Sequence, residues 1–185
     1  CKLYEQAATL APTSIDAQLG LASALYQTGE AERAEQLYRQ FLEKRPNEVH
    51  ALNDLAWILQ EHFHRYDAAL ELANKALKLT SSDQKDLLRS LLDTRATILM
   101  NLPDRLAEAR NYYVQLVDLW PDKTAGKARI LLRLGRLCVQ LNDPVQAGQH
   151  FRNALEIDRE INVFTPAERT EISTEISRLA QRSGR

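Results

Sequence analysis

Apolar residues recur every three or four positions along most of the chain, the spacing of helices that bury one face. In SIDAQLGLASALYQTGEAERAEQLYRQFLEKRPN, residues 14–47, this spacing predicts two helices joined by a turn. Pro46 ends the second helix, because proline cannot continue the hydrogen-bond ladder of the backbone. This stretch is therefore expected to fold as a helix–turn–helix unit.

The same pattern recurs further along the chain. When Val49 is placed beneath Ile15, Ala56 falls beneath Ala22, and residues 91–122 and 128–159 follow the same scheme. These small residues would let the two helices of a unit approach closely. Successive equivalent positions are separated by 34, 35, 40 and 38 residues: Ala7, Phe41, Ala76, Leu116 and Ala154. Such regular spacing indicates an internal repeat, whose units become stable by stacking on one another.

The units share small residues, three of them carry a large aromatic residue in the second helix, and two of them end at a proline. The clearest examples are Ala34, Tyr38 and Pro46 in the first unit and Leu134, Gly135, Ala147, Phe151 and Ala154 in the fourth. Over roughly residues 1–160 this pattern resembles the tetratricopeptide repeat (TPR) family, whose unit is a helix–turn–helix of about 34 residues. The resemblance implies an all-α fold, a right-handed α-solenoid of helix–turn–helix (TPR-like) repeats with a C-terminal capping helix.

We expect six segments along the chain. They are the second helix of a truncated repeat (1–14), TPR unit 1 (15–48), unit 2 (49–81), unit 3 with a lengthened first helix (82–122), unit 4 (123–161) and a C-terminal capping helix (165–182). The segment Ser81–Gln84 has the form of a capping box, which predicts that the first helix of unit 3 is longer by more than one turn.

Both ends of the chain leave alternatives open. Near the C-terminus, Thr165, Pro166 and Glu168 form a strong helix start, and the helix that follows has one apolar face. We favour a cap over the last repeat, and the alternative is a docking site for a partner helix. At the N-terminus, we favour truncation of a longer array over a lipoprotein acylated at Cys1.

Composition and charge narrow the functional classes. Leu, Ala, Glu, Arg and Gln dominate the chain, and all of them favour helix. A net charge of −1 gives no general attraction to nucleic acid or to anionic membranes. No apolar run approaches the roughly 20 residues that a membrane span needs. Cys1 and Cys138 give no disulfide framework, and we expect Cys138 to be an inert buried thiol.

The stretch QEHFHRYD, residues 60–67, is the one candidate for metal chemistry. Glu61, His62, His64 and Asp67 are residue types that bind transition metals. The repeat, however, places them in the turn between the two helices of unit 2, so we favour a solvated turn over a metal site. The chain also has no Gly-rich phosphate loop and no G-x-S-x-G or H-E-x-x-H motif. We therefore expect no enzyme, no cofactor and no metal.

The resemblance implies that the first helices of the units line a concave groove that binds protein partners. Carried over to this sequence, the groove positions of interest are Tyr26, Asn53, Trp57, Arg129, Arg133 and Arg136. Aromatic residues are common binding anchors, and an arginine stripe could hold carboxylates. The alternatives are that Trp57 packs between units and that the arginines form a solvated helix face.

The function expected from these features is a non-catalytic protein–protein interaction scaffold that binds an extended or helical peptide. The main alternative is a structural, spacer or self-association module of a larger protein, which associates through the open N-terminal edge. RNA binding through the arginine stripe is a weaker alternative because of the net charge.

Overall fold

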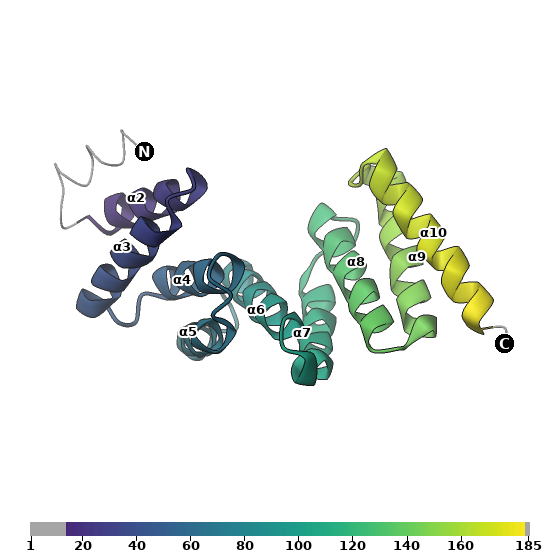
Figure 1. Cartoon of the computed structure of the whole chain (residues 1–185). Helices are drawn as coiled ribbons and strands as arrows, with labels where there is room; N and C mark the ends of the chain where they lie inside the picture. Colours follow the sequence, from purple (N-terminus) through teal and green to yellow (C-terminus); the bar gives the residue numbers. More distant parts are fainter. Residues whose placement is uncertain (1–13, 184–185) are drawn as a thin grey trace. The chain divides into compact units, whose positions relative to one another are not determined.

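A computed structural model describes residues 14–183, and every regular element in this range is a helix (Figure 1). The predicted helix of the truncated repeat falls almost entirely on residues 1–13, which lie outside the described residues. The elements are α2 (Ile15–Gln27), α3 (Ala31–Lys44), α4 (Val49–Glu61), α5 (Tyr66–Leu79), α6 (Lys85–Met100), the 3-10 helix η1 (Pro103–Arg105), α7 (Leu106–Leu119), α8 (Ala125–Gln140), α9 (Pro144–Ile161) and α10 (Pro166–Ser183).

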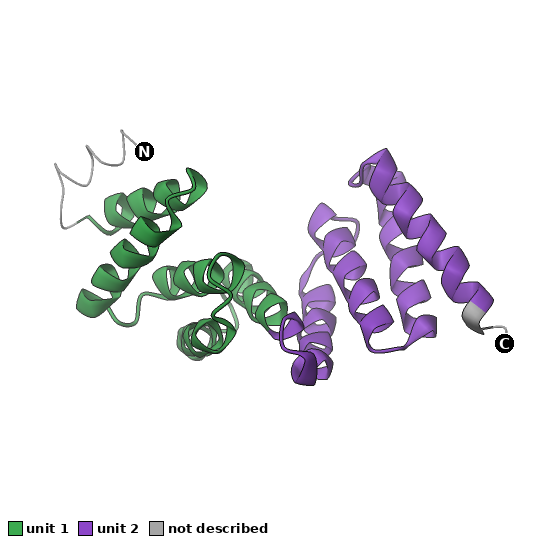
Figure 2. Cartoon of the chain, viewed as in Figure 1, with its two compact units in different colours: residues 1–98 green, residues 99–185 purple. Residues whose placement is uncertain are grey.

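The chain divides into two compact units, each larger than one of the repeats numbered above. Unit 1 now denotes residues 1–98 and unit 2 residues 99–185 (Figure 2). In unit 1, α2 packs against α3 and α4 packs against α5, while α3 also contacts α4. In unit 2, α7 packs against α8, α8 against α9, and α10 against α9. The all-α class predicted from the sequence is therefore confirmed, and consecutive helices are the packing partners.

The crossing points of the helix pairs are occupied by small residues. Ala22 and Ala34 in the first pair, and Ala56 in the second, are at most 1% exposed. In unit 2 the α8–α9 crossing is tighter still, because a β-carbon added to Gly135 would lie 2.5 Å from the Phe151 ring. Real carbon atoms do not approach that closely, so any larger residue at this position would force the Phe151 ring to move. The predicted role of the small residues in close helix approach is confirmed.

The turns within three helix pairs share one backbone conformation. Gly29, His64 and Asn142 all have positive φ angles, of 89°, 55° and 57°. The first and third turns close with a hydrogen bond to the carbonyl oxygen five residues earlier, an arrangement that ends helices with a left-handed residue. In the α4–α5 turn this bond spans six residues, from Arg65 N to Leu59 O at 2.9 Å, because the turn is one residue longer.

The two helix starts singled out in the sequence behave differently. At α10 the capping box is complete, because Glu168 N donates to Thr165 Oγ1 at 3.2 Å and Thr165 N donates to Glu168 Oε2 at 2.7 Å. α6 is longer than α4, as predicted, with 16 residues against 13, but the difference is less than the full turn that the sequence predicted. The Ser81 N–H bonds the Gln84 side chain in a turn that precedes the helix, so helical structure begins only at Lys85.

We predict that Gly135→Ala destabilises the protein by about 1–3 kcal/mol, because the new methyl group would force the Phe151 ring out of its position. The matched control is Gly148→Ala on α9, where a β-carbon would lie 3.4 Å from the flexible end of Arg152. The control should stabilise the helix by about 1 kcal/mol. Urea unfolding followed by circular dichroism measures both changes, and equal midpoints for the two variants would contradict the close-packing argument.

Candidate functional site

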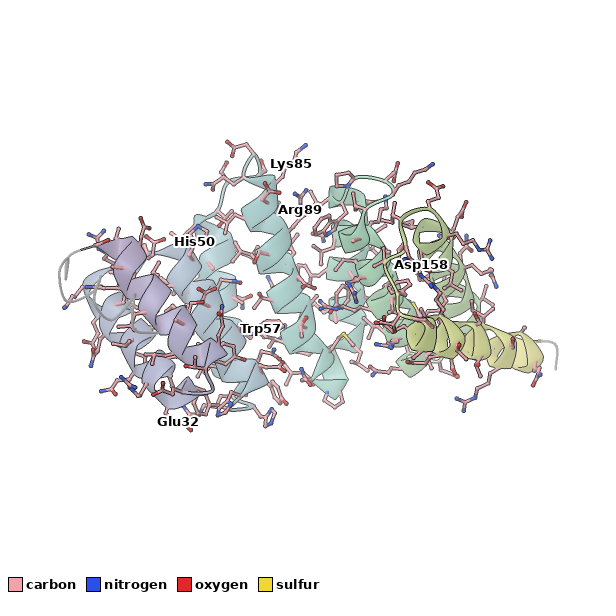
Figure 3. All side chains as sticks on the ribbon, turned by 90° about the horizontal axis from the view of Figure 1, so that it is seen from above. Glu32, His50, Trp57, Lys85, Arg89 and Asp158 are labelled. Carbon is pink, nitrogen blue, oxygen red and sulfur yellow. The ribbon has the colours of Figure 1, made fainter. Side chains whose placement is uncertain are left out.

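One face of α4 in unit 1 carries polar and aromatic side chains. His50, Asn53 and Trp57 are spaced three and four residues apart and therefore share a face of the helix, along which Figure 3 labels His50 and Trp57. Trp57 is half-buried, so it neither points freely into solvent nor belongs to the fully buried core. The face is thus partly accessible to a ligand.

Tyr26 of α2 lies beside this face. Burial raises the pKa of Tyr26, the negative charge of Glu61 adds to the rise, and a polar interaction with Trp57 opposes it. These causes place the phenol close to side chains at the C-terminal end of α4. The structure thus brings together two of the predicted site residues, the aromatic pair Tyr26 and Trp57.

Asn53 joins α4 to α6. Its Nδ2 lies 3.5 Å from Ser90 Oγ, at the long limit of a hydrogen bond, and its Oδ1 is buried without a hydrogen-bond partner among the described residues. Tyr26, Asn53 and Trp57 form what we call the unit 1 surface, to which α2 and α4 contribute the side chains and α6 adds Ser90.

A partly buried hydrogen bond joins α3 to α4 at Asp54, the residue after Asn53. The Tyr38 hydroxyl of α3 donates to Asp54 Oδ2 of α4 at 3.0 Å. Burial raises the pKa of Asp54, although the bond from Tyr38 and the charge of His50 oppose the rise. The sequence indicated Tyr38 only as an aromatic residue of the repeat pattern. The partner of its hydroxyl was missed, because Asp54 resembles any other polar position on a helix face.

The arginine stripe of unit 2 faces acidic residues at the start of α10. Arg136 Nη2 lies 2.8 Å from Glu171 Oε1, and Arg129 Nη1 lies 3.6 Å from Glu168 Oε1. Arg129 also donates to the Val163 carbonyl oxygen at 3.4 Å, and Arg133 is half-buried. Exposed pairs of this kind contribute little stability. A ligand carboxylate could displace them, but it would compete with two carboxylates of the chain itself.

Asp158 forms hydrogen bonds that stabilise the connection from α9 to α10. This carboxylate, labelled in Figure 3, is only 3% exposed. It accepts hydrogen bonds from Arg169 Nε at 2.5 Å and from the backbone N–H of Phe164 at 2.6 Å. The Arg169 guanidinium holds the pKa of Asp158 below its ordinary value, which burial alone would raise. Sequence reasoning missed this contact, because nothing in the repeat pattern distinguishes Asp158 from solvated carboxylates.

The histidines of QEHFHRYD make local contacts in the α4–α5 turn. His62 Nε2 lies 3.8 Å from Glu32 Oε1 of α3, and the His64 ring lies 3.3 Å from the Tyr66 hydroxyl. His64 also supplies the left-handed residue of the turn. Within residues 14–183, no group of three or more His, Cys, Asp or Glu side chains is arranged to hold a metal ion. The contacts of both histidines are therefore those of residues in a turn between two helices.

Two further features concern Cys138 and the apolar character of the helices. Cys138 is fully buried in α8, and burial raises the pKa of its thiol, as expected for an inert cysteine. Over the same range of the chain, no helix combines the length and the apolar character that crossing a membrane requires.

Comparisons with known proteins agree with this architecture. Family models for the tetratricopeptide repeat match residues 2–58 and residues 104–160, which together exceed half of the chain. A search of curated protein sequences gave no match.

Several solved structures share the fold. Yeast Tom70 is 22% identical with a TM-score of 0.73, and the match covers 98% of this chain and 36% of that one. PilF of Pseudomonas aeruginosa is 23% identical with a TM-score of 0.68, covering 91% of this chain and 68% of that one. The MamA RS-1 ArsTM double mutant is 18% identical with a TM-score of 0.71, covering 88% and 85%. Likeness at these identities shows the fold, a helical repeat solenoid.

We predict that Asp158→Asn loosens the attachment of α10 and lowers the melting temperature at neutral pH. Because the folded-state pKa of Asp158 lies below the unfolded-state value, its contribution to stability is present above about pH 4. That contribution is lost as the pH falls through the folded-state pKa. The variant should therefore lose less stability than the wild type on acidification.

Thermal melts between about pH 7 and pH 3, followed by circular dichroism, measure this difference. The control is Glu160→Gln on the same helix, because Glu160 forms an exposed ion pair with Lys123 and should have little effect. Parallel pH profiles of Asp158→Asn and the wild type would count against a stabilising role for the Asp158 carboxylate.

Proposed function

The chain belongs to the tetratricopeptide repeat family, and from this premise we propose that it binds an extended or helical peptide of a partner protein on the unit 1 surface. The family is generally a non-catalytic protein-interaction fold, which makes a protein-interaction scaffold the general function. The finer assignment, a peptide held by Tyr26, Asn53 and Trp57, is our proposal.

The observation that carries the proposal is the half-buried aromatic pair Tyr26 and Trp57 beside the incompletely bonded amide of Asn53. Aromatic side chains bury a large apolar area on binding and keep a polar group at one end. An asparagine amide offers both a donor and an acceptor, as a peptide backbone does. The surface therefore combines apolar anchors with a group suited to main-chain recognition.

The arginines of unit 2 enter the proposal as a second contact region. Arg129, Arg133 and Arg136 would hold acidic residues of a partner, once these displace Glu168 and Glu171 from the exposed ion pairs. The exchange replaces one exposed arginine–carboxylate pair by another, so the change in free energy is small. Self-association through the N-terminal edge concerns residues 1–13, outside the described range, and stays a prediction.

We predict that Trp57→Ala and Tyr26→Ala each weaken partner binding by about tenfold or more, because anchors of this kind contribute the largest share of binding energy. Partners are captured from a lysate on the immobilised chain, and the affinity of the captured protein is then measured for each variant. Val145→Ala, which removes a side chain that is 63% exposed on α9, is the control and should bind normally. Unchanged capture by both aromatic variants would exclude the unit 1 surface.

A fluorescence measurement reports on the same surface directly. The chain has two tryptophans, so Trp120→Phe leaves Trp57 as the single indole reporter. A peptide that covers Trp57 should shift its emission to shorter wavelength, because the indole leaves water. Binding that leaves the emission unchanged would place the ligand elsewhere.

A further inference from the structure

The two helices that form the unit 1 surface carry acidic residues and no lysine or arginine. α2 has the sequence IDAQLGLASALYQ and α4 the sequence VHALNDLAWILQE, whose acidic residues are Asp16, Asp54 and Glu61 and whose one titratable base is His50. α8, which carries the arginine stripe of unit 2, has the opposite composition, with four lysines and arginines and no acidic residue. Because charged surfaces attract segments of the opposite sign, the unit 1 surface is complementary to a basic segment of a partner.

Glu61 places a carboxylate beside the aromatic pair. It lies four residues after Trp57, on the same face of α4. Tyr26 of α2 interacts with both residues, through a side-chain hydrogen bond with Trp57 and through the negative charge of Glu61. Gln60, which is only 2% exposed, holds the carboxylate in place because its Nε2 donates to Glu61 Oε2 at 3.1 Å. Glu61 is itself exposed, so a ligand can reach it.

The basic residues nearest to Glu61 along the chain contact other carboxylates. His62 Nε2 lies 3.8 Å from Glu32 Oε1, and Arg65 Nη1 lies 3.0 Å from Glu35 Oε1, so both side chains interact with α3. Neither α2 nor α4 has a basic residue in its last turn, where the partial negative charge of a helix C-terminus favours one. The negative charge at this end of the surface therefore has no basic counterpart on the two helices that form it.

The exposed cation of α6 lies toward the other end of the surface. Lys85 and Arg89 belong to the first two turns of α6, and Figure 3 labels both nearer to His50 than to Trp57. Arg95, the third basic residue of α6, is half-buried, with its Nε fully buried. The part of the surface beside the aromatic pair is therefore the acidic part, and a basic group of a partner is attracted there.

The unit 1 surface lies between helices whose neighbours in the array are already in place. α2 contacts α4 on one side, and on the other side Leu91 of α6 packs with Leu52 of α4 in one core cluster. A further repeat would therefore stack elsewhere, and the surface needs a ligand of a different kind.

We propose that the partner peptide carries a lysine or arginine whose charged group lies against the Tyr26 and Trp57 rings and pairs with the Glu61 carboxylate. This inference rests on the proposed function and adds the chemistry of the ligand. Cations bind the faces of tyrosine and tryptophan rings, and a carboxylate beside the rings adds an ion pair. The apolar stem of the basic side chain covers the rings, while the Asn53 amide bonds the peptide backbone.

Peptides selected from a random heptapeptide library displayed on phage test the proposal. The immobilised whole chain captures the peptides, and the Trp57→Ala variant identifies those whose capture depends on the unit 1 surface. These peptides should share a lysine or arginine at one position. Replacing that lysine by norleucine, or that arginine by citrulline, removes the charge and keeps the stem. The replacement should weaken binding about tenfold, measured by fluorescence polarisation of labelled synthetic peptides.

A matched pair of protein variants tests the carboxylate. Glu61→Gln removes the charge and keeps an oxygen that accepts the bond from Gln60. It should weaken binding of the basic peptide about fivefold and leave binding of the uncharged peptide unchanged. Glu71→Gln, at an exposed position of α5, is the control and should leave both affinities unchanged. Because Glu61 and Glu71 are exposed, both variants should keep the wild-type melting temperature.

The possible outcomes separate a failure of this proposal from a failure of the proposed function. If no selected peptide depends on Trp57, the proposed function fails and the basic ligand fails with it. If peptides that depend on Trp57 share no basic residue, the proposed function stands and the basic ligand is overturned. The same holds if Glu61→Gln binds the basic peptide as tightly as the wild type does.

Discussion

The structure depends on the close approach of paired helices at positions that have room only for a small side chain. Where Gly135 of α8 meets Phe151 of α9, even one extra carbon would overlap the ring. The alanines at the equivalent positions, such as Ala22 and Ala56, are buried to at least 99%. Each close crossing brings the large residues of both helices into contact around it, so one small residue determines how a much larger apolar area is buried. This explains why the repeat can vary in length, between 34 and 40 residues, while the small positions persist.

Two polar contacts of the described residues join neighbouring helices. Tyr38 bonds Asp54 between α3 and α4, and Asp158 bonds Arg169 and the backbone at the start of α10. Arg129 and Arg136 of the basic stripe face Glu168 and Glu171, so the chain already provides carboxylates at the place where a ligand's would bind. The half-buried residues Tyr26 and Trp57 are the part of the described surface on which our proposal of peptide recognition rests.

The sequence predicted those features that depend on residues close together in the chain. The capping box of Thr165 and Glu168 and the small residues of each pair follow from local spacing, and both are present. The histidines of QEHFHRYD show the limit of such reasoning. Residue types alone suggested a metal, whereas His64 adopts the left-handed conformation that glycine and asparagine adopt in the other two turns. The ion pairs of Arg136 and Asp158 were not predictable, because each joins residues whose proximity is decided only by how α10 packs.

α10 carries more of the repeat pattern than a covering helix needs. A helix that only covers the end of an array needs one apolar face toward α9, and Ile172 and Leu179 provide it. Nothing in that role requires a small residue at Ser173, directly after Ile172, where α4 has Ala56 after Leu55 and α8 has Gly135 after Leu134. The register of the repeat therefore continues through α10.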